Sequence, residues 1–443
     1  MPGFHKSVQD IGNGEFHELV ARFEKHRNFK FVVDRKVKND DGEDVEYEPG
    51  SGIMSQRGEQ YAFPANDPAI LAEIKEDRKY VKGLKTEPDE TYEIPSLNGR
   101  KYEWKPHRVE LYGITHDKIE RIRDDVFSSG RLLRQASIHG ASHSIAMLVT
   151  LLKEKIPFDY CYYTNLPNEM IDEREYVLYY TRHVLKVPLI VIVPQNTAEE
   201  YFYRRQVFPT QFRRWCTDLM KLDPLRRFLK IEYLDQLPKN SSFDMLQFLG
   251  MQAFQSPGRA AMSPKPQPSM LSVPQPFKKV PSPTCEVYES GKQMGTIMNI
   301  NVVNWPVDRG TGQFTGIEDL KDMRARNGRR VMRVFDMLPV FYLSHEDDMA
   351  IIRNKKIIRN PNEREFGRHG CLLCPFADWH YYHQLRTTPR YKHLYEECVK
   401  RRYAASQQQI EKGDRKEPWM QYGSSNYTNA MAEFGYTKKD PVF

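Results

Sequence analysis

The feature that most constrains the fold is the stretch RLLRQASIHGASHSIAMLVTLL at residues 131–152. It predicts a short strand, a turn of small residues and an apolar helix, because Ile145, Met147, Leu148 and Leu151 recur at helical spacing. Such a turn lets backbone amides approach an anion, and the helix N-terminus behind it carries about half a positive charge. Tight strand-to-helix packing in any α/β protein needs the same turn, so an anion site and a purely structural turn both remain open.

The pattern that follows predicts a sheet buried on both faces. A strand at residues 159–164 is followed by an amphipathic helix at 169–186 and by the apolar strand PLIVIV at 188–193. We therefore expect an α/β fold, with a Rossmann-like parallel sheet and helices on both faces. Its carboxyl edge should collect the loop at 137–144 and the turn at 164–168, where open α/β sheets bind ligands.

The N-terminal quarter reads as an accessory α+β region that carries no chemical motif. Its turn signals and apolar spacing predict a helix at 15–27, a hairpin through 29–47, a helix at 68–78 and a second hairpin at 93–104 around Asn98-Gly99. We place the boundary of this region at residue 110. The α/β domain then begins at residue 111 and runs to 255.

The composition changes sharply after residue 255. Residues 256–284 hold much of the 29 Pro of the chain and predict an extended, mobile insertion. Ordered patterning returns at residues 285–390, where Ser344 is expected to cap a helix. Residues 391–443 predict a basic, helical C-terminal tail, which is either a solvated face or a contact for nucleic acid or a protein partner.

Charge and cysteine usage limit the class of protein. The 66 Lys+Arg exceed the 59 Asp+Glu by 7, a mild basic balance that suits either an anionic ligand or an ordinary mixed surface. Six cysteines with one close pair do not resemble a secreted disulfide framework and favour a reducing compartment. Without an apolar run long enough to span a bilayer, we expect a cytoplasmic protein with no membrane partner.

Basic and aromatic residues gather in the run FPTQFRRWCTDLMKLDPLRRFLK at residues 208–230. Arg213, Arg214 and Lys221 offer positive charge to an anion, and Trp215 offers a flat surface to a base. The alternative is a basic amphipathic helix in which Cys216 is simply a small buried residue.

A second chemical cluster lies in FGRHGCLLCPF at residues 366–376. The spacing of Cys371 and Cys374 lets two thiolates reach one metal ion or cluster, while a redox pair and plain structural thiols remain alternatives. Cys216 is the best third candidate because it lies beside the expected anion groove. Further candidates for a fourth ligand are Cys161, Cys285, Cys398 and His369.

Four motifs in this order resemble the phosphoadenosine phosphosulfate (PAPS) reductase family, a branch of the adenine-nucleotide α-hydrolase-like (PP-loop) fold. They are SIHGASHSIAML, YYTNLPNE, RWCTDLMKLDPLRRFL and GRHGCLLCPF, and the resemblance covers about residues 115–255 and 330–390. It implies that an adenine nucleotide or sulfonucleotide lies across the sheet edge, with its phosphate or sulfate end on the first loop.

The resemblance also implies roles for individual residues. The nucleotide-binding residues are Ser137, His139, Gly140, Ala141, Ser142, Ser144, Arg213, Arg214, Lys221 and Arg259. The candidate catalytic residues are Cys216, Ser142 and His143. Cys216, Cys371 and Cys374 are expected to hold an iron–sulfur cluster, with zinc as the alternative, and three-cysteine ligation leaves one iron open for sulfur transfer or sulfonucleotide reduction.

The chain departs from the family pattern at positions that matter for chemistry. Ser142 and His143 stand where ATP-using members have Lys and Asp, and Gln252 and Gln255 stand where Arg and Glu are expected. The chain ends GYTKKDPVF instead of carrying the reductases' nucleophilic cysteine tail. These departures keep open a second hypothesis, a catalytically degenerate nucleotide fold that acts as a scaffold or nucleic-acid-binding protein.

Overall fold

The computed structural model describes residues 36–38, 44–46, 68–96, 103–205, 215–252, 298–301, 330–337, 339–340, 343, 345–367, 369–372, 374, 379–394 and 411–412. The expected helix at 15–27, the insertion at 256–284 and nearly all of the C-terminal tail lie outside these residues. So do Ser344, Arg213, Arg214, Arg259, Gln255, Cys285 and Cys398.

An eight-stranded sheet organises the described part of the chain, in the order β3-β4-β7-β6-β5-β8-β10-β9. The strands from β7 to β9 in that order are parallel, whereas β3 and β4 join at one edge through antiparallel pairs. The bounds are β3 Glu90–Ile94, β4 His107–Tyr112, β5 Leu133–Ser137, β6 Tyr160–Thr164, β7 Leu189–Pro194, β8 Ser242–Leu249, β9 Met298–Asn301 and β10 Val331–Met337. A separate two-stranded hairpin pairs β1 (Lys36–Lys38) with β2 (Asp44–Glu46).

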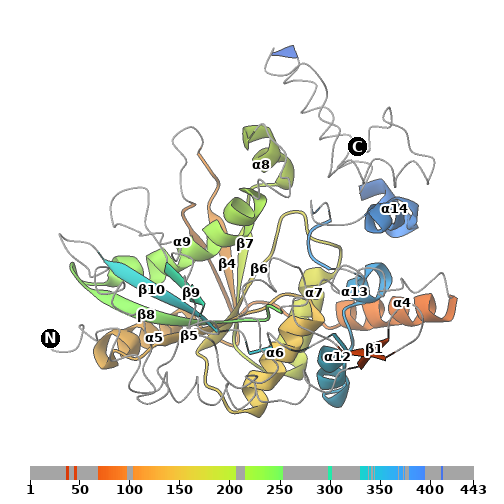
Figure 1. Cartoon of the computed structure of the whole chain (residues 1–443). Helices are drawn as coiled ribbons and strands as arrows, with labels where there is room; N and C mark the ends of the chain where they lie inside the picture. The colour runs from red at the N-terminus through yellow and green to blue at the C-terminus, as the bar shows by residue number, and fades with distance from the viewer. Residues whose placement is uncertain are drawn as a thin grey trace.

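Helices connect and cover these strands (Figure 1). They are α4 Pro68–Gly83, α5 His116–Ser129, α6 Ser142–Lys153, α7 Glu173–Leu178, α8 Ala198–Arg205, α9 Asp223–Glu232, α12 His345–Asn354, α13 Pro361–Phe366 and α14 Trp379–Thr387. Wider π-helical turns, η2 Tyr179–Val184 and η3 Thr217–Leu222, follow α7 and precede α9, and the short 3₁₀ turn η4 spans Leu234–Gln236. None of the described helices is long and apolar enough to cross a membrane.

Two apolar clusters lie on opposite faces of the sheet. Along β7, Leu189 and Val191 belong to the cluster that holds residues of α6, α7 and α12, while Ile190 and Ile192 belong to the cluster that holds residues of α5 and α9. This alternation follows from the period of two along a strand. It confirms the α/β class and a sheet with helices on both faces.

The expected Rossmann-like parallel sheet is present only in part, because the sheet is mixed at one edge. β4 runs antiparallel to β7, and its Val109 and Leu111 are fully buried. β3 lies outside β4 and has the alternating exposure of an edge strand. Antiparallel strands of this kind commonly close the edge of an otherwise parallel sheet because one face of the edge strand can remain solvated.

The expected second hairpin is also displaced. The strand that pairs with β3 is β4, which begins at His107, and Trp104 lies before it outside any strand. The indole of Trp104 instead stacks on Tyr201 of α8, with ring centroids 4.9 Å apart. A tertiary contact therefore overrides the local strand preference of Trp.

The parallel strands create a reversal of strand order beside β5. From β5 the chain proceeds through β6 to β7 on one side, and β8 then pairs with β5 on the other side. In open α/β sheets, the crevice at the carboxyl ends of two such strands is where ligands bind. The loop that follows β5 leads directly into α6 at this position.

Close backbone approach at this edge explains a glycine after β8. A Cβ on Gly250 would lie 2.9 Å from the Cα of Ser144 and 3.0 Å from the carbonyl oxygen of His143. Both are backbone atoms at the start of α6, so neither can rotate away. Gly250 therefore lets the end of β8 lie against the first turn of α6.

We predict that Gly250→Ala lowers the free energy of unfolding by about 1–3 kcal/mol, because it forces these two backbones apart. Urea unfolding followed by circular dichroism measures the change. Gly83→Ala is the matched control, since a Cβ there meets nothing within 4 Å. Equal midpoints for the two variants would contradict the close approach.

Candidate functional site

The loop between β5 and α6 is held by its own side chains and by a buried carboxylate. Ser144 Oγ accepts a hydrogen bond from the His139 amide at 2.9 Å. The Ser142 amide donates to Glu363 Oε2 at 3.2 Å, and the Ser142 hydroxyl donates to the same oxygen. The carboxylate of Glu363 thus lies at the positive end of α6, where an external anion was expected.

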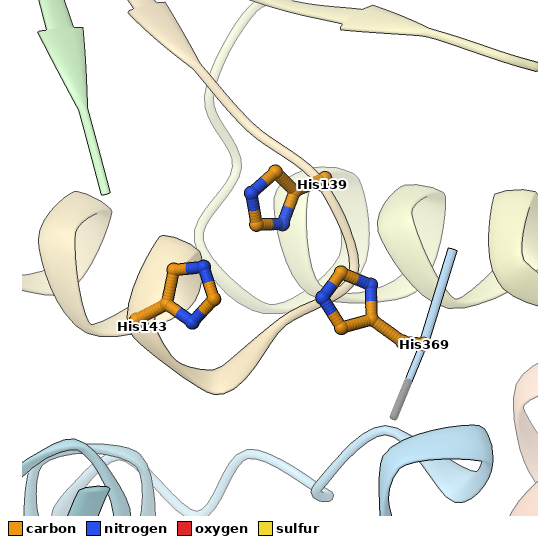
Figure 2. Close-up of side chains that lie close together, drawn as sticks. All are labelled: His139, His143 and His369. Carbon is orange, nitrogen blue, oxygen red and sulfur yellow. The ribbon is translucent and has the colours of Figure 1, made fainter. Parts of the chain in front are cut away.

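Three histidine rings meet at this loop (Figure 2). His139 belongs to the loop, His143 to the first turn of α6, and His369 to the segment after α13. The ring centroid of His139 lies 4.9 Å from that of His143 and 5.0 Å from that of His369. The ring centroids of His143 and His369 are 6.2 Å apart. One potential ligand atom from each ring lies within 4.8 Å of the others.

A buried glutamate orients one of the rings. Glu173, 1% exposed, lies 3.1 Å from His369 Nδ1. It also accepts hydrogen bonds of 3.0 Å from the side-chain amides of Asn360 and Asn362. Burial raises the pKa of Glu173, but the hydrogen bonds from His369 and the two amides outweigh it and hold the pKa below its usual range. A carboxylate in this position favours the His369 tautomer that donates from Nδ1, the tautomer in which Nε2 can bind a ligand.

Backbone hydrogen bonds fix the segment that carries His369. The Met170 amide donates to the Gly370 carbonyl at 2.8 Å, and the Leu372 amide donates to the Asn168 carbonyl at 2.7 Å. A bridge between Glu169 and Cys371 completes this short pairing. The segment is thereby attached to the loop after β6, at the same carboxyl edge as His139.

A hydrogen bond to the backbone restrains the His139 ring. The Ala141 amide lies 3.3 Å from His139 Nδ1, which acts as the acceptor. Metal ligation through either nitrogen of this ring would require the bond to be given up. At this length the bond is worth about 1 kcal/mol or less, so this cost is small beside the free energy of a metal–ligand bond.

A second carboxyl group lies at the end of β6. Glu169 receives hydrogen bonds from the Tyr163 hydroxyl and from Asn165 Nδ2, the latter at 2.8 Å. Burial and the nearby charge of Glu173 raise the pKa of Glu169 to about 8, against the opposing effect of these bonds and of Lys221. Lys221, a predicted anion-binding residue, therefore lies near this carboxyl edge.

Of the three predicted cysteine ligands, Cys216 lies near Cys374, but the three do not form a closed mononuclear site among the described residues. Burial and the nearby thiol of Cys374 raise the pKa of Cys216. Three sulfurs bound to one tetrahedral zinc ion at about 2.3 Å lie about 3.8 Å from one another. Among the described residues, the group of three potential ligand atoms within 4.8 Å of one another is the histidine triad, and Cys216, Cys371 and Cys374 do not form such a group. A cluster does not require it, because its thiolates bind different irons.

The remaining predicted site residues in the described part of the chain are mostly buried and packed within the fold. Ser137 ends β5 and is partly buried, and Ala141 is fully buried as the N-cap of α6. A Cβ on Gly140 would collide with Glu173 and Asn360, so this glycine serves close packing. Cys161 is fully buried in the apolar cluster beneath α6 and α7, and burial raises the pKa of its thiol.

Sequence reasoning identified the loop but not its histidine chemistry. It treated His139 as part of an anion loop, His143 as a candidate catalytic residue and His369 only as a possible fourth ligand for the cysteines. The signal available was the occurrence of two histidines, His139 and His143, within one short turn before an apolar helix. No local pattern marked the supporting residues Glu173, Asn360, Asn362 and Glu363.

Compared with known proteins, the chain matches no family model, no curated protein and no solved structure.

We predict that Glu169→Gln stabilises the protein at high pH. A carboxyl whose folded pKa is raised to about 8 must be ionised at a cost, so the wild type loses stability as the pH rises from about 4.5 to 8. The melting temperature of the variant relative to wild type should therefore increase between pH 5 and pH 9. Thermal unfolding across this range measures it.

The control for this experiment is Glu87→Gln, which removes an exposed carboxylate. The difference in melting temperature between this variant and the wild type should not change with pH over the same range, because a solvated carboxylate contributes little to stability. A flat profile for Glu169→Gln as well would contradict the raised pKa.

Proposed function

We propose that the chain binds an adenine nucleotide or sulfonucleotide at the carboxyl ends of β5 and β8 and acts in sulfur transfer or sulfonucleotide reduction. The observation that supports this function best is the reversal of strand order beside β5, with a small-residue loop and a helix start at that edge. The four motifs that resemble the PAPS reductase family point to the same ligand.

The neighbouring elements offer groups suited to this ligand. Lys221 lies in η3 near the end of β6, and the Thr164 hydroxyl contacts its carbonyl at 3.4 Å. Trp215 and Cys216 precede η3 and pack with Leu166 in one small cluster. A cation, a flat ring and a thiol thus lie along one edge, which suits a phosphate, a base and sulfur chemistry respectively.

One observation favours the second candidate, a degenerate nucleotide fold that acts as a scaffold. Glu363 occupies the N-terminus of α6, where it accepts from both the amide and the hydroxyl of Ser142. A phosphate at this position would be repelled by the Glu363 carboxylate, which already accepts the hydrogen bonds of Ser142. The nucleotide must therefore either displace Glu363 or place its anionic group closer to Lys221.

We predict that calorimetry with sulfated and unsulfated adenosine nucleotides detects binding to the wild-type protein. Lys221→Ala should weaken that binding about 10–150-fold, because a hydrogen bond to a charged group is worth about 1.5–3 kcal/mol. Lys153→Ala is the matched control, since this exposed lysine lies at the opposite end of α6. Equal affinities for the two variants would remove Lys221 from the site.

Glu363→Gln separates the enzyme hypothesis from the scaffold hypothesis. If the wild type binds no nucleotide and Glu363→Gln binds one, the internal carboxylate closes the site and the scaffold hypothesis gains support. If the wild type binds and the variant binds at least as tightly, the carboxylate gives way to ligand and the enzyme hypothesis gains support.

A further inference from the structure

The histidine triad has the donor atoms of a metal site and a spacing close to that of one. Its three potential ligand atoms lie within 4.8 Å of one another. Nitrogens bound to one tetrahedral zinc ion at about 2.0–2.1 Å lie about 3.3–3.4 Å apart, so the separations need to shorten by about 1.4 Å at most. Figure 2 shows the three rings turned toward a common space.

The three rings are held by separate parts of the fold that meet at this edge. His139 follows β5, His143 lies in the first turn of α6, and His369 is attached to the loop after β6 by backbone hydrogen bonds. A site assembled on sheet and helix ends has little freedom to collapse. Most of the entropic cost of ordering the three histidine side chains is therefore incurred when the protein folds, and metal binding needs little further ordering.

A carboxylate supports one ligand, as in established histidine–metal sites. Glu173 lies 3.1 Å from His369 Nδ1 and is itself fixed by Asn360 and Asn362. In metal sites this arrangement sets the tautomer of the ring and makes its other nitrogen more basic.

The local charge balance accommodates a cation. The N-terminus of α6 disfavours positive charge near His143. Two buried carboxylates, Glu173 and Glu363, lie at the same end of the helix and offset this effect. A metal ion can accept one lone pair from each of the three adjacent imidazoles.

We infer that His139, His143 and His369 bind one divalent transition-metal ion, with zinc the best-matched ion. Imidazole nitrogens suit zinc, copper, iron and nickel, whereas magnesium and calcium prefer oxygen ligands. Three protein ligands leave a coordination position for water or an anion, as in catalytic zinc sites. The ion would then supply Lewis-acid chemistry at a phosphate, sulfate or water oxygen. The inference does not depend on nucleotide binding.

Metal titration of the chelator-treated, full-length protein tests the site. Calorimetry with Zn²⁺ should give one equivalent bound to the wild type. His139→Ala, His143→Ala and His369→Ala should each weaken binding at least about 100-fold, and Glu173→Gln should weaken it about 10–100-fold. The matched control is His393→Ala, which removes an exposed histidine and should bind as wild type does.

Two outcomes overturn the inference. One is wild-type affinity in all three single-histidine variants. The other is zinc binding that is lost in Cys371→Ser and Cys374→Ser but retained in the histidine variants, which would assign the ion to the cysteines.

The Co²⁺-loaded wild type provides a test that needs no variant to fold. Nitrogen ligation predicts visible d–d bands without thiolate-to-cobalt charge transfer. Charge-transfer absorption, or the absence of any cobalt spectrum at one equivalent, overturns the inference. Zinc should also raise the melting temperature, because a ligand that binds only the folded state stabilises it, and an unchanged value would contradict the site.

Discussion

The buried carboxylate of Glu173 is the interaction on which the candidate site depends. It begins α7, receives hydrogen bonds from Asn360 and Asn362 around the start of α13, and orients His369. Its side chain also lies where Gly140 has no Cβ. Removing one partner from a buried charged network costs about 3–5 kcal/mol, so elements far apart in the chain are coupled through this one group.

The sheet explains why these elements can meet. Parallel strands direct their carboxyl ends to a single edge, and the reversal beside β5 separates the loops that follow β5 and β8. Gly250 then allows the end of β8 to approach the start of α6. The crevice position is therefore a consequence of topology, whereas its chemistry comes from the side chains that the loops supply.

The segment after α13 brings together two kinds of residue that can bind metal, a histidine and a cysteine. His369 joins the histidine triad, and Cys374 lies close enough to Cys216 to affect the pKa of its thiol. Backbone pairing with residues 168–170 holds this segment at the end of β6. Imidazole and thiolate chemistry thus lie within one late segment, although the described geometry assembles the three potential ligands of a single ion only at the histidines.

The sequence by itself determined the α/β class, the unit from β5 to α6, the buried strands β6 and β7, and the loop that carries His139 and His143. These predictions rest on periodicity and turn chemistry, which act within a few residues. Only the tertiary structure decided that β3 and β4 close the sheet in antiparallel fashion, that Glu363 lies at the start of α6, and that His369 meets the loop. Those outcomes depend on packing between segments distant in the chain, and no local pattern encodes which buried carboxylate will meet which helix end or imidazole.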